Sequence, residues 1–234
     1  MLLQHVDGPL LILTLNEPDR ANPLSPEMAS VLTEALEDAA ADPGVRAVIL
    51  TGAGRHFSAG ADLAALEQVA QDGDAGANLA DSRRLEGLFA VLLAHPKLTV
   101  AAVSGAAIAG GCGLATACDF VVAAPGSRFS YTEVKIGFMP ALVSTFLTRR
   151  VPGHIARRLL LDPEMLDGSQ ALELGLVDEL SGEGEVLDRA RVLALGICSK
   201  ASPSALAATK ALMNRTVGMG WREALAVAAE ANAE

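Results

Sequence analysis

Residues 98–124 read LTVAAVSGAAIAGGCGLATACDFVVAA, and no charged side chain interrupts the first 21 of them. An uncharged stretch of this length is long enough to cross a bilayer as one helix. Its internal pattern predicts something else, because LTVAAV is typical of a buried strand and the glycines of SGAAIAGGCG interrupt a single helix. We therefore predict a buried strand at 98–103, a turn, a buried helix and a second strand at 120–124, with no membrane span.

Strands and helices alternate on both sides of this segment. Further strands, rich in β-branched and aliphatic residues, are predicted at 10–16, 45–51 and 128–131. Ser25 followed by Pro26 is a typical helix start, and apolar residues at helical spacing from 28 to 39 predict an amphipathic helix behind it. From residue 140 onward the pattern is mainly helical. This order indicates an α/β core with a helical C-terminal part.

Composition excludes several classes of function. The 234 residues carry 18 basic and 28 acidic side chains, a net charge of -10, and no basic stripe that could attract nucleic acid. Cys112, Cys118 and Cys198 are odd in number and lack C-x-x-C spacing, so we expect reduced, buried thiols and neither disulfides nor a metal site. The N-terminus has no basic region and is broken by a charge, a glycine and a proline at 7–9, which is unlike a signal peptide. We expect a cytoplasmic protein.

Two glycine-rich turns, FSAGADL at 57–63 and AGGCGL at 109–114, each follow a predicted strand. Small residues let a ligand approach the backbone, and a helix N-terminus presents unpaired N–H groups to negative charge. Two such groups that converge on a carbonyl oxygen would stabilise an oxyanion, and removing one donor typically costs about 3 kcal/mol. Taken alone, however, glycine after a strand is more often an ordinary turn.

Four stretches in the same order resemble the enoyl-CoA hydratase/isomerase (crotonase) family over nearly the whole chain. They are LTLNEPDRANPLSPEM at 13–28, VRAVILTGAGRHFSAGADL at 45–63, VAAVSGAAIAGGCGLATACDFVVAAPGSRFSYTEVKIG at 100–137 and ALELGLVDEL at 171–180. The resemblance implies an α/β, crotonase-like (ClpP/crotonase) fold of repeated strand-strand-helix units with a helical C-terminal part. It also implies a core at 1–180 and a C-terminal helical trimerisation segment at 181–234, shorter than in the family.

The resemblance carries a site and a reaction with it. It implies that the N–H groups of Ala61 and Gly110 form an oxyanion hole and that Glu133 moves a proton at the α-carbon of the substrate. The implied substrate-binding residues are Ala59, Ala61, Asp62, Leu63 and Gly110. The expected function is hydration or double-bond isomerisation of acyl-CoA thioesters through an enolate, in fatty-acid or related acyl-CoA metabolism. Coenzyme A is then part of the substrate, no further cofactor is expected, and the assembly is a homotrimer or a dimer of trimers.

One departure from the family pattern leaves the reaction open. Two-glutamate hydratases have a second glutamate directly after Gly-Gly-Cys, where this chain has Gly113. A hydration mechanism with paired carboxylates is therefore incomplete, and one glutamate suits isomerisation. Hydration would need another group to activate water, such as Asp62, Tyr131 or Glu164.

Two further functions compete with an enzyme that stabilises an enolate. The first is a non-catalytic acyl-CoA-binding crotonase-like protein, which Gly113 and the short C-terminal segment favour and Glu133 opposes. The second is a serine peptidase, because a related protease shares this architecture. Ser58 does not fit the nucleophile motif G-x-S-x-G, since His56 stands where the first glycine is required. His56 itself has no partner at metal-ligand spacing and is expected to be structural.

Overall fold

Strands that are mostly parallel form the centre of the molecule, as the computed structural model of residues 1–60 and 75–233 shows. Within these residues a six-stranded sheet has the order β1-β2-β3-β4-β6-β9. Its strands are β1 (Leu2–Asp7), β2 (Leu10–Leu15), β3 (Ala47–Gly52), β4 (Leu98–Val103), β6 (Phe120–Ala123) and β9 (Glu179–Leu180). The hairpin β1–β2 is antiparallel, and every other neighbouring pair is parallel.

A second, smaller sheet lies next to the carboxyl end of the first. In the described part of the chain it has the order β5-β7-β8, from β5 (Ala106–Ile108), β7 (Arg128–Ser130) and β8 (Leu166–Asp167). β5 follows β4 after two residues, and β7 follows β6 after four, so the chain passes from the large sheet into the small one twice. The strands that lead to the two glycine-rich turns and to Glu133 are therefore neighbours in space.

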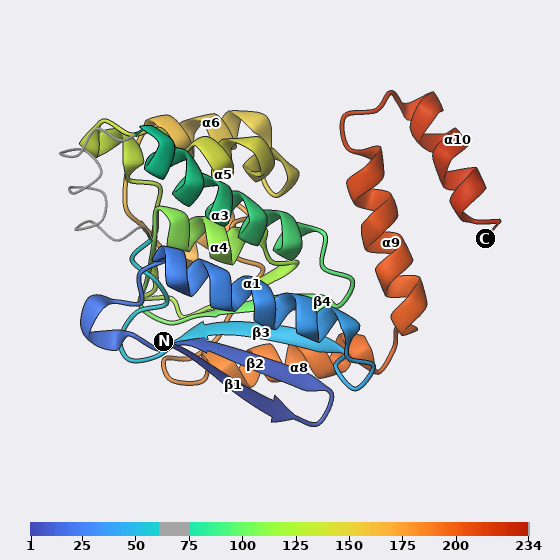
Figure 1. The fold of residues 1–234 in the computed structure, drawn as a ribbon, viewed down its shortest axis with the longest axis horizontal. Coiled ribbons are helices and arrows are strands. Elements are labelled where there is room, and N and C mark those ends of the chain that lie inside the picture. The colour runs from blue at the N-terminus through green and yellow to red at the C-terminus, as the bar shows by residue number, and fades with distance from the viewer. Residues whose placement is uncertain (61–74, 234) are drawn as a thin grey trace.

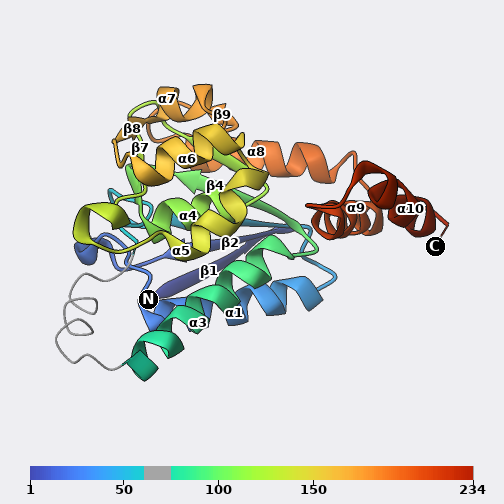
Figure 2. The ribbon, with the colours of Figure 1, turned by 90° about the horizontal axis from the view of Figure 1, so that it is seen from above.

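Helices cover both faces of the large sheet (Figures 1 and 2). One face carries α1 (Pro26–Ala41), α3 (Ala75–Leu93) and α4 (Gly110–Ala117), and the other carries α8 (Val186–Cys198). Successive residues of a strand point to opposite faces. In β2, for example, Leu11 and Leu13 pack into the core under α1 and α4, while Leu10 and Ile12 pack against α8. Burial on both faces explains why these strands are continuously apolar.

The elements expected from the sequence are confirmed in type. Ser25 caps α1 by accepting a hydrogen bond from the Met28 N–H at 3.1 Å, and Pro26 occupies the first helical position. The segment 98–124 folds as β4, α4 and β6, with the short strand β5 inserted before α4. Five of the described strands and α-helices were not predicted: β1, β5, β8, β9 and the last helix, α10 (Trp221–Ala231). β5, β8 and β9 are very short, and most of β1 is exposed, so none of these strands gives a clear pattern of apolar residues.

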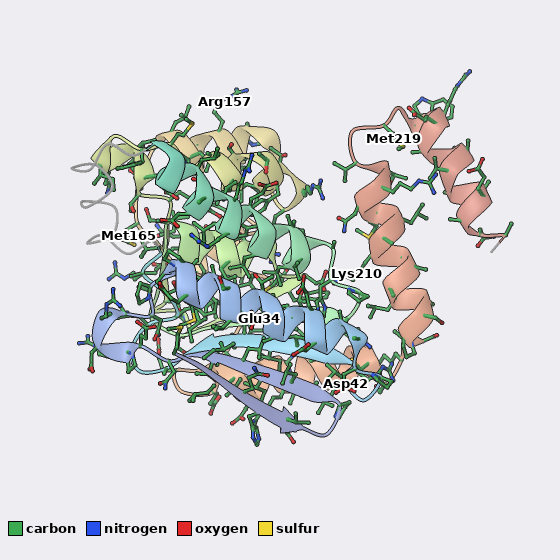
Figure 3. All side chains as sticks on the ribbon, in the orientation of Figure 1. Glu34, Asp42, Arg157, Met165, Lys210 and Met219 are labelled. Atoms are coloured by element: carbon green, nitrogen blue, oxygen red, sulfur yellow. The ribbon has the colours of Figure 1, made fainter. Side chains whose placement is uncertain are left out.

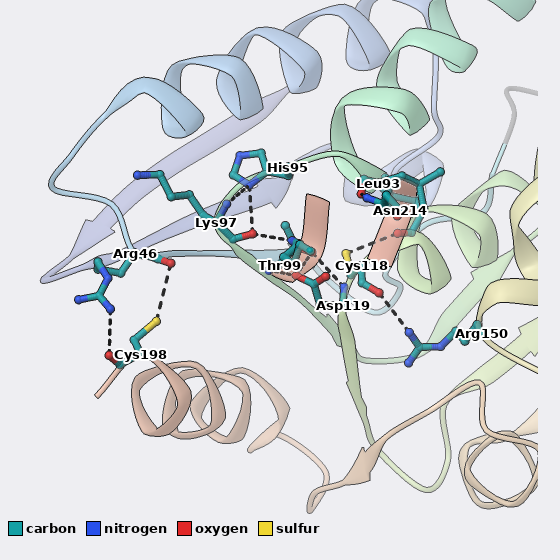
Figure 4. Close-up of polar contacts among 12 residues, drawn as sticks. Arg46, Leu93, His95, Lys97, Thr99, Cys118, Asp119, Arg150, Cys198 and Asn214 are labelled. Atoms are coloured by element: carbon teal, nitrogen blue, oxygen red, sulfur yellow. Dashed lines mark hydrogen bonds and ion pairs between the residues drawn. The ribbon is translucent and has the colours of Figure 1, made fainter. Parts of the chain in front are cut away.

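The remaining helices are α5 (Ala141–Phe146), α6 (Gly153–Leu161), α7 (Gly168–Glu173) and α9 (Pro203–Thr216). Figures 1 and 2 show α9 and α10 as an arm beside the body. Neither helix of the arm has a buried residue, and α9 is attached by polar contacts. Lys210, labelled in Figure 3, donates to the Lys97 carbonyl at 2.7 Å and pairs with Asp119 at 2.5 Å. Asn214 donates to the Leu93 carbonyl at 2.8 Å (Figure 4).

The C-terminal end of α8 is hydrogen-bonded to the residue that precedes β3. Arg46, just before β3, donates to the carbonyl oxygen of Cys198 at 3.0 Å (Figure 4). It also donates to the carbonyl oxygen of Ala201 at 2.9 Å. Among the described residues no single helix is long and apolar enough to span a membrane. The pair α8 and α9 satisfies the length and composition only when taken together, and it is bent by 101°.

Candidate active site

A cavity of about 610 Å³ lies where the two glycine-rich turns meet the segment that begins with Glu133. Its walls are predominantly apolar and come from loops and helices distant in sequence. The lining residues are Arg20, Pro23, Leu24, Ala59, Ser82, Leu85, Phe89, Ile108, Ala109, Gly110, Thr132, Glu133, Ile136, Phe138, Met139, Pro140, Ala141, Leu142 and Val143. An apolar cavity with few polar groups is typical of a small-molecule site.

The first glycine-rich turn packs directly on the second. The Ser58 N–H donates to the Ala106 carbonyl at 3.0 Å, and the Ile108 N–H donates to the Ser58 carbonyl at 2.9 Å. Gly60 has φ of +82°, and a Cβ there would lie 2.5 Å from the Ile108 carbonyl oxygen and 3.0 Å from the Gly110 nitrogen. Only glycine fits so close to a neighbouring backbone. The structure therefore brings Ala59 and Gly60 beside Gly110, while Ala61, Asp62 and Leu63 lie outside the described residues.

Gly110 is the first residue of α4, where helix N–H groups have no acceptor within the helix. Ala109 before it has φ of 50° and ψ of -123°, a conformation that is costly for a residue with a side chain. The Ala109 N–H donates to the Ser130 carbonyl at 2.8 Å, and the Gly113 N–H donates to the Ala109 carbonyl at 3.0 Å, which holds this turn in place. Among the described residues no acceptor is found for the Gly110 N–H, so it can donate to a ligand in the cavity.

Glu133 is the acidic residue of the cavity lining. It begins a short 3-10 helix directly after β7, and its Oε2 atom is buried without a hydrogen-bond partner in the described structure. Burial raises the pKa of this carboxyl above its usual value, although the Glu133 backbone N–H acts in the opposite direction. A carboxyl group with a raised pKa takes up and returns a proton at a higher pH than a free glutamate does.

The raised pKa has a consequence for stability. The folded chain binds the Glu133 proton more tightly than the unfolded chain, and the stability this contributes is lost as pH rises through the folded-state pKa. Glu133→Gln has no charge to bury, so we expect it to melt at a higher temperature than wild type at neutral pH. The gap should shrink as pH falls through the raised pKa of Glu133 toward the ordinary value of a glutamate. Melting curves of both proteins from about pH 4 to pH 8 test this. A gap that does not depend on pH would contradict the assignment.

The position of the missing second carboxylate is filled by apolar side chains. Gly113 is buried on α4, and a Cβ there would lie 2.7 Å from Val143 Cγ2 and 3.3 Å from Phe89 Cζ. Both neighbours line the cavity. Phe89 in turn packs on Phe146, with ring centroids 5.3 Å apart. The chain therefore has an apolar wall where a two-glutamate hydratase has its second carboxylate.

Two of the three other candidates for water activation are absent from the cavity lining. Tyr131 is 1% exposed, and its hydroxyl pairs with Thr116 Oγ1 at 2.9 Å inside the core. Glu164 lies on the surface 3.5 Å from Arg158. Neither residue lines the cavity, and the third candidate, Asp62, lies outside the described residues. The structure therefore does not bring Tyr131 or Glu164 into the cavity lining beside Glu133.

Two other residues noted in the sequence have structural roles. His56 Nδ1 accepts a hydrogen bond from the Ala106 N–H at 3.2 Å, which fastens the first turn to β5. Ser58 is fully buried, and its hydroxyl accepts a hydrogen bond from the Gly60 N–H at 3.2 Å. The three cysteines are free and buried, and burial raises the pKa of Cys112 and Cys118 to about 12.

Most of the apolar lining was missed by reasoning from sequence. Leu85, Phe89, Leu142 and Val143 belong to helices whose apolar residues have the same spacing as those that fill a core. The sequence offers no signal that separates a wall of a cavity from the core. Arg20, in contrast, lies within the matched stretch 13–28 and was available as a candidate.

Comparison with known proteins agrees with this geometry. The family model described as enoyl-CoA hydratase/isomerase matches residues 7–233. A Thermus thermophilus protein with the provisional name enoyl-CoA hydratase is 48% identical over 232 residues, 99% of this chain and 91% of the relative. The 2,3-dehydroadipyl-CoA hydratase of Escherichia coli is 36% identical over 93% of this chain and 83% of its own.

Solved structures show the same relationship. An enoyl-CoA hydratase from Polaromonas sp. JS666 has a TM-score of 0.91 at 32% identity, over 99% of this chain and 90% of its own. An enoyl-CoA hydratase from Mycobacterium smegmatis has a TM-score of 0.91 at 30% identity, over 99% of this chain and 89% of its own. The crotonase-like fold implied by the sequence resemblance is confirmed, and the chain belongs to the enoyl-CoA hydratase/isomerase family.

Proposed function

We propose that this chain binds an enoyl-CoA thioester and holds its carbonyl oxygen with the N–H groups of Gly110 and Ala61 while Glu133 transfers a proton. One observation carries the proposal: among the described residues neither the Oε2 of Glu133 nor the N–H of Gly110 has a hydrogen-bond partner, and both residues line the same apolar cavity. Removing the α-proton of a thioester places negative charge on the carbonyl oxygen. N–H donors aimed at that oxygen stabilise the charge as it develops.

We further propose that double-bond isomerisation is favoured over hydration. Glu133 removes a proton from C2 of a 3-enoyl-CoA, the electrons move onto the thioester oxygen as a dienolate, and the same carboxyl returns the proton to C4. This step needs one base and no water. Hydration needs a second group to hold and activate water. The apolar side chains of Val143 and Phe89 at the Gly113 position support the one-base reaction.

Introducing the second carboxylate tests this preference. Gly113→Glu alone should destabilise the fold, because its Cβ would lie 2.7 Å from Val143 Cγ2. Overpacking of this kind typically costs about 1 to 3 kcal/mol. Gly113→Glu combined with Val143→Ala removes that clash, and we expect it to melt at a higher temperature than the single variant. The double variant should also raise the ratio of hydration to isomerisation relative to wild type.

The measurement is a chromatographic product assay on 2-enoyl-CoA and 3-enoyl-CoA, together with melting curves. Val143→Ala alone is the matched control, because it opens the same space without adding a carboxylate. If wild type hydrates 2-enoyl-CoA rapidly and never isomerises 3-enoyl-CoA, the proposed preference is wrong.

A non-catalytic acyl-CoA-binding protein is the second candidate, and the Gly113 position favours it. The buried oxygen of Glu133, which has no partner in the described part of the chain, opposes it, because such a group costs stability and a protein that only binds has no use for it. Hydration of 2-enoyl-CoA removes the ultraviolet absorbance of the conjugated thioester. Isomerisation of 3-enoyl-CoA to 2-enoyl-CoA produces that absorbance. Binding without either change would favour the second candidate.

We also propose that the chain assembles as a homotrimer or a dimer of trimers, as the family resemblance implies. Four large apolar side chains on the arm or its connection support this: Met213 is 66% exposed, Val217 52%, Trp221 69% and Leu225 62%. Exposed apolar side chains of this size are typical of a surface that another chain covers.

A further inference from the structure

Asn22 is a buried polar residue whose role the site described above does not explain. It lies in the loop between β2 and α1, is 0% exposed and has φ of 54°. Its side chain makes three hydrogen bonds to backbone groups. Oδ1 accepts from the Glu17 N–H at 2.8 Å, and Nδ2 donates to the carbonyls of Ala53 at 2.9 Å and His56 at 2.7 Å. Asparagine tolerates a positive φ better than most residues.

The three partners also fix which way the amide points. Two carbonyl oxygens face Nδ2, and carbonyls can only accept, so the group between them must be a donor. The Glu17 N–H can only donate, so Oδ1 must face it. An aspartate has the same size and also tolerates positive φ. In Asn22→Asp a carboxylate oxygen would replace Nδ2 and face the carbonyl oxygens of Ala53 and His56, which it would repel.

The loop that contains Asn22 forms a wall of the cavity. Its neighbours Arg20, Pro23 and Leu24 line the cavity, whereas Asn22 does not. The side chain of Asn22 donates hydrogen bonds to Ala53 and His56, which precede the first glycine-rich turn. Asn22 therefore connects two segments that meet at the site without touching the ligand space.

Two backbone hydrogen bonds continue this connection into the turn itself. The Ala59 N–H donates to the Ala21 carbonyl at 2.8 Å, and the Leu24 N–H donates to the Gly60 carbonyl at 2.8 Å. Ala21, like Asn22, has a positive φ, of 58°. Both hydrogen bonds depend on the chain reversal that these two residues make. If Ala21 and Asn22 leave this conformation, Ala59 and Gly60 lose these two hydrogen bonds.

We infer that Asn22 is a positioning residue for the reaction, which holds the turn at Ala59 and Gly60 against the N–H of Gly110. A Cβ on Gly60 would lie 3.0 Å from the Gly110 nitrogen, so a small shift of this turn changes the space beside the donor. Misplacement by about 1 Å can lower a rate about 10²-fold. The inference rests on the proposed function, because it requires that the Gly110 N–H binds the thioester oxygen.

The experiment compares Asn22→Asp and Asn22→Gly with wild type. Asn22→Gly keeps the backbone conformation accessible and deletes the side chain, so it remains informative if the aspartate variant does not fold. Leu36→Ala is the control for general loss of stability, because Leu36 is 0% exposed on α1 and does not line the cavity. The readouts are the melting temperature, kcat and the Kd for an enoyl-CoA. The infrared carbonyl frequency of a bound enoyl-CoA labelled with ¹³C at the thioester carbon is also measured, since it falls when N–H groups polarise the carbonyl.

We expect both Asn22 variants to lower kcat by about 10- to 100-fold, to change Kd by less than about threefold, and to lose part of the carbonyl shift. Leu36→Ala should have a lower melting temperature than wild type, with unchanged kcat and an unchanged carbonyl shift. Asn22 variants that behave like Leu36→Ala would overturn the inference and leave the proposed function intact. A wild-type complex without any carbonyl shift would overturn the oxyanion proposal, and the inference with it.

Discussion

Glu133→Gln is expected to lower turnover of an enoyl-CoA by about 10² to 10⁴, the range in which general acid–base groups act. Glutamine preserves the shape of the side chain and cannot exchange a proton. The unpartnered Oε2 of Glu133 makes this a sensitive change, because no neighbour among the described residues competes for that oxygen. Steady-state rates on 2-enoyl-CoA and 3-enoyl-CoA measure the effect.

Binding separates loss of chemistry from loss of the site. The Kd of Glu133→Gln for an unreactive saturated acyl-CoA should stay near that of wild type, because the apolar lining of the cavity is unchanged. The melting temperature at neutral pH should not fall, since the variant removes a partly buried charge. A folded variant with more than half of the wild-type activity would remove Glu133 from the mechanism.

Gly110→Pro is expected to abolish measurable turnover. Proline has no N–H, and loss of a single oxyanion donor typically lowers kcat by about 10² to 10³. Gly110 is the first residue of α4, a position at which proline is tolerated in helices. Proline also restricts the residue before it, and Ala109 already has φ of 50°. Circular dichroism and a melting curve must therefore show that the variant is folded.

Gly110→Ala is the matched comparison, because it adds bulk at the same position and keeps the donor. The expected order of activity is wild type, then Gly110→Ala, then Gly110→Pro. If Gly110→Pro is folded and as active as Gly110→Ala, the N–H of this residue does not bind the thioester oxygen.

The parts of the fold that depend on local chemistry could be predicted from the sequence. Ser25 and Pro26 mark the start of α1 because capping is a local hydrogen bond. Residues 98–103 are apolar throughout because β4 is covered on both faces, and its six residues are all buried. The glycines at 60 and 110 indicated close backbone approach, and the structure places them beside each other.

The parts that depend on contacts distant in sequence could not be predicted. Gly113 marked a missing carboxylate, but nothing in the sequence shows that Val143 and Phe89 fill its place. The raised pKa of Glu133 results from burial by surrounding segments, which no motif records. Asn22 lies within the matched stretch 13–28, but two of its three hydrogen bonds reach Ala53 and His56, which are distant in sequence.

The central claim is that Glu133 moves a proton at the α-carbon of a bound acyl-CoA thioester. Incubation of a 3-enoyl-CoA with the protein in D₂O, followed by mass spectrometry and NMR, tests it most directly. We predict that wild type converts 3-enoyl-CoA to 2-enoyl-CoA and that deuterium enters at C2 or C4 in those turnovers in which the Glu133 carboxyl exchanges its proton with solvent before returning it. Glu133→Gln should give neither product nor deuterium. A wild-type protein that binds the thioester with full occupancy and leaves every C2 proton in place would contradict the account.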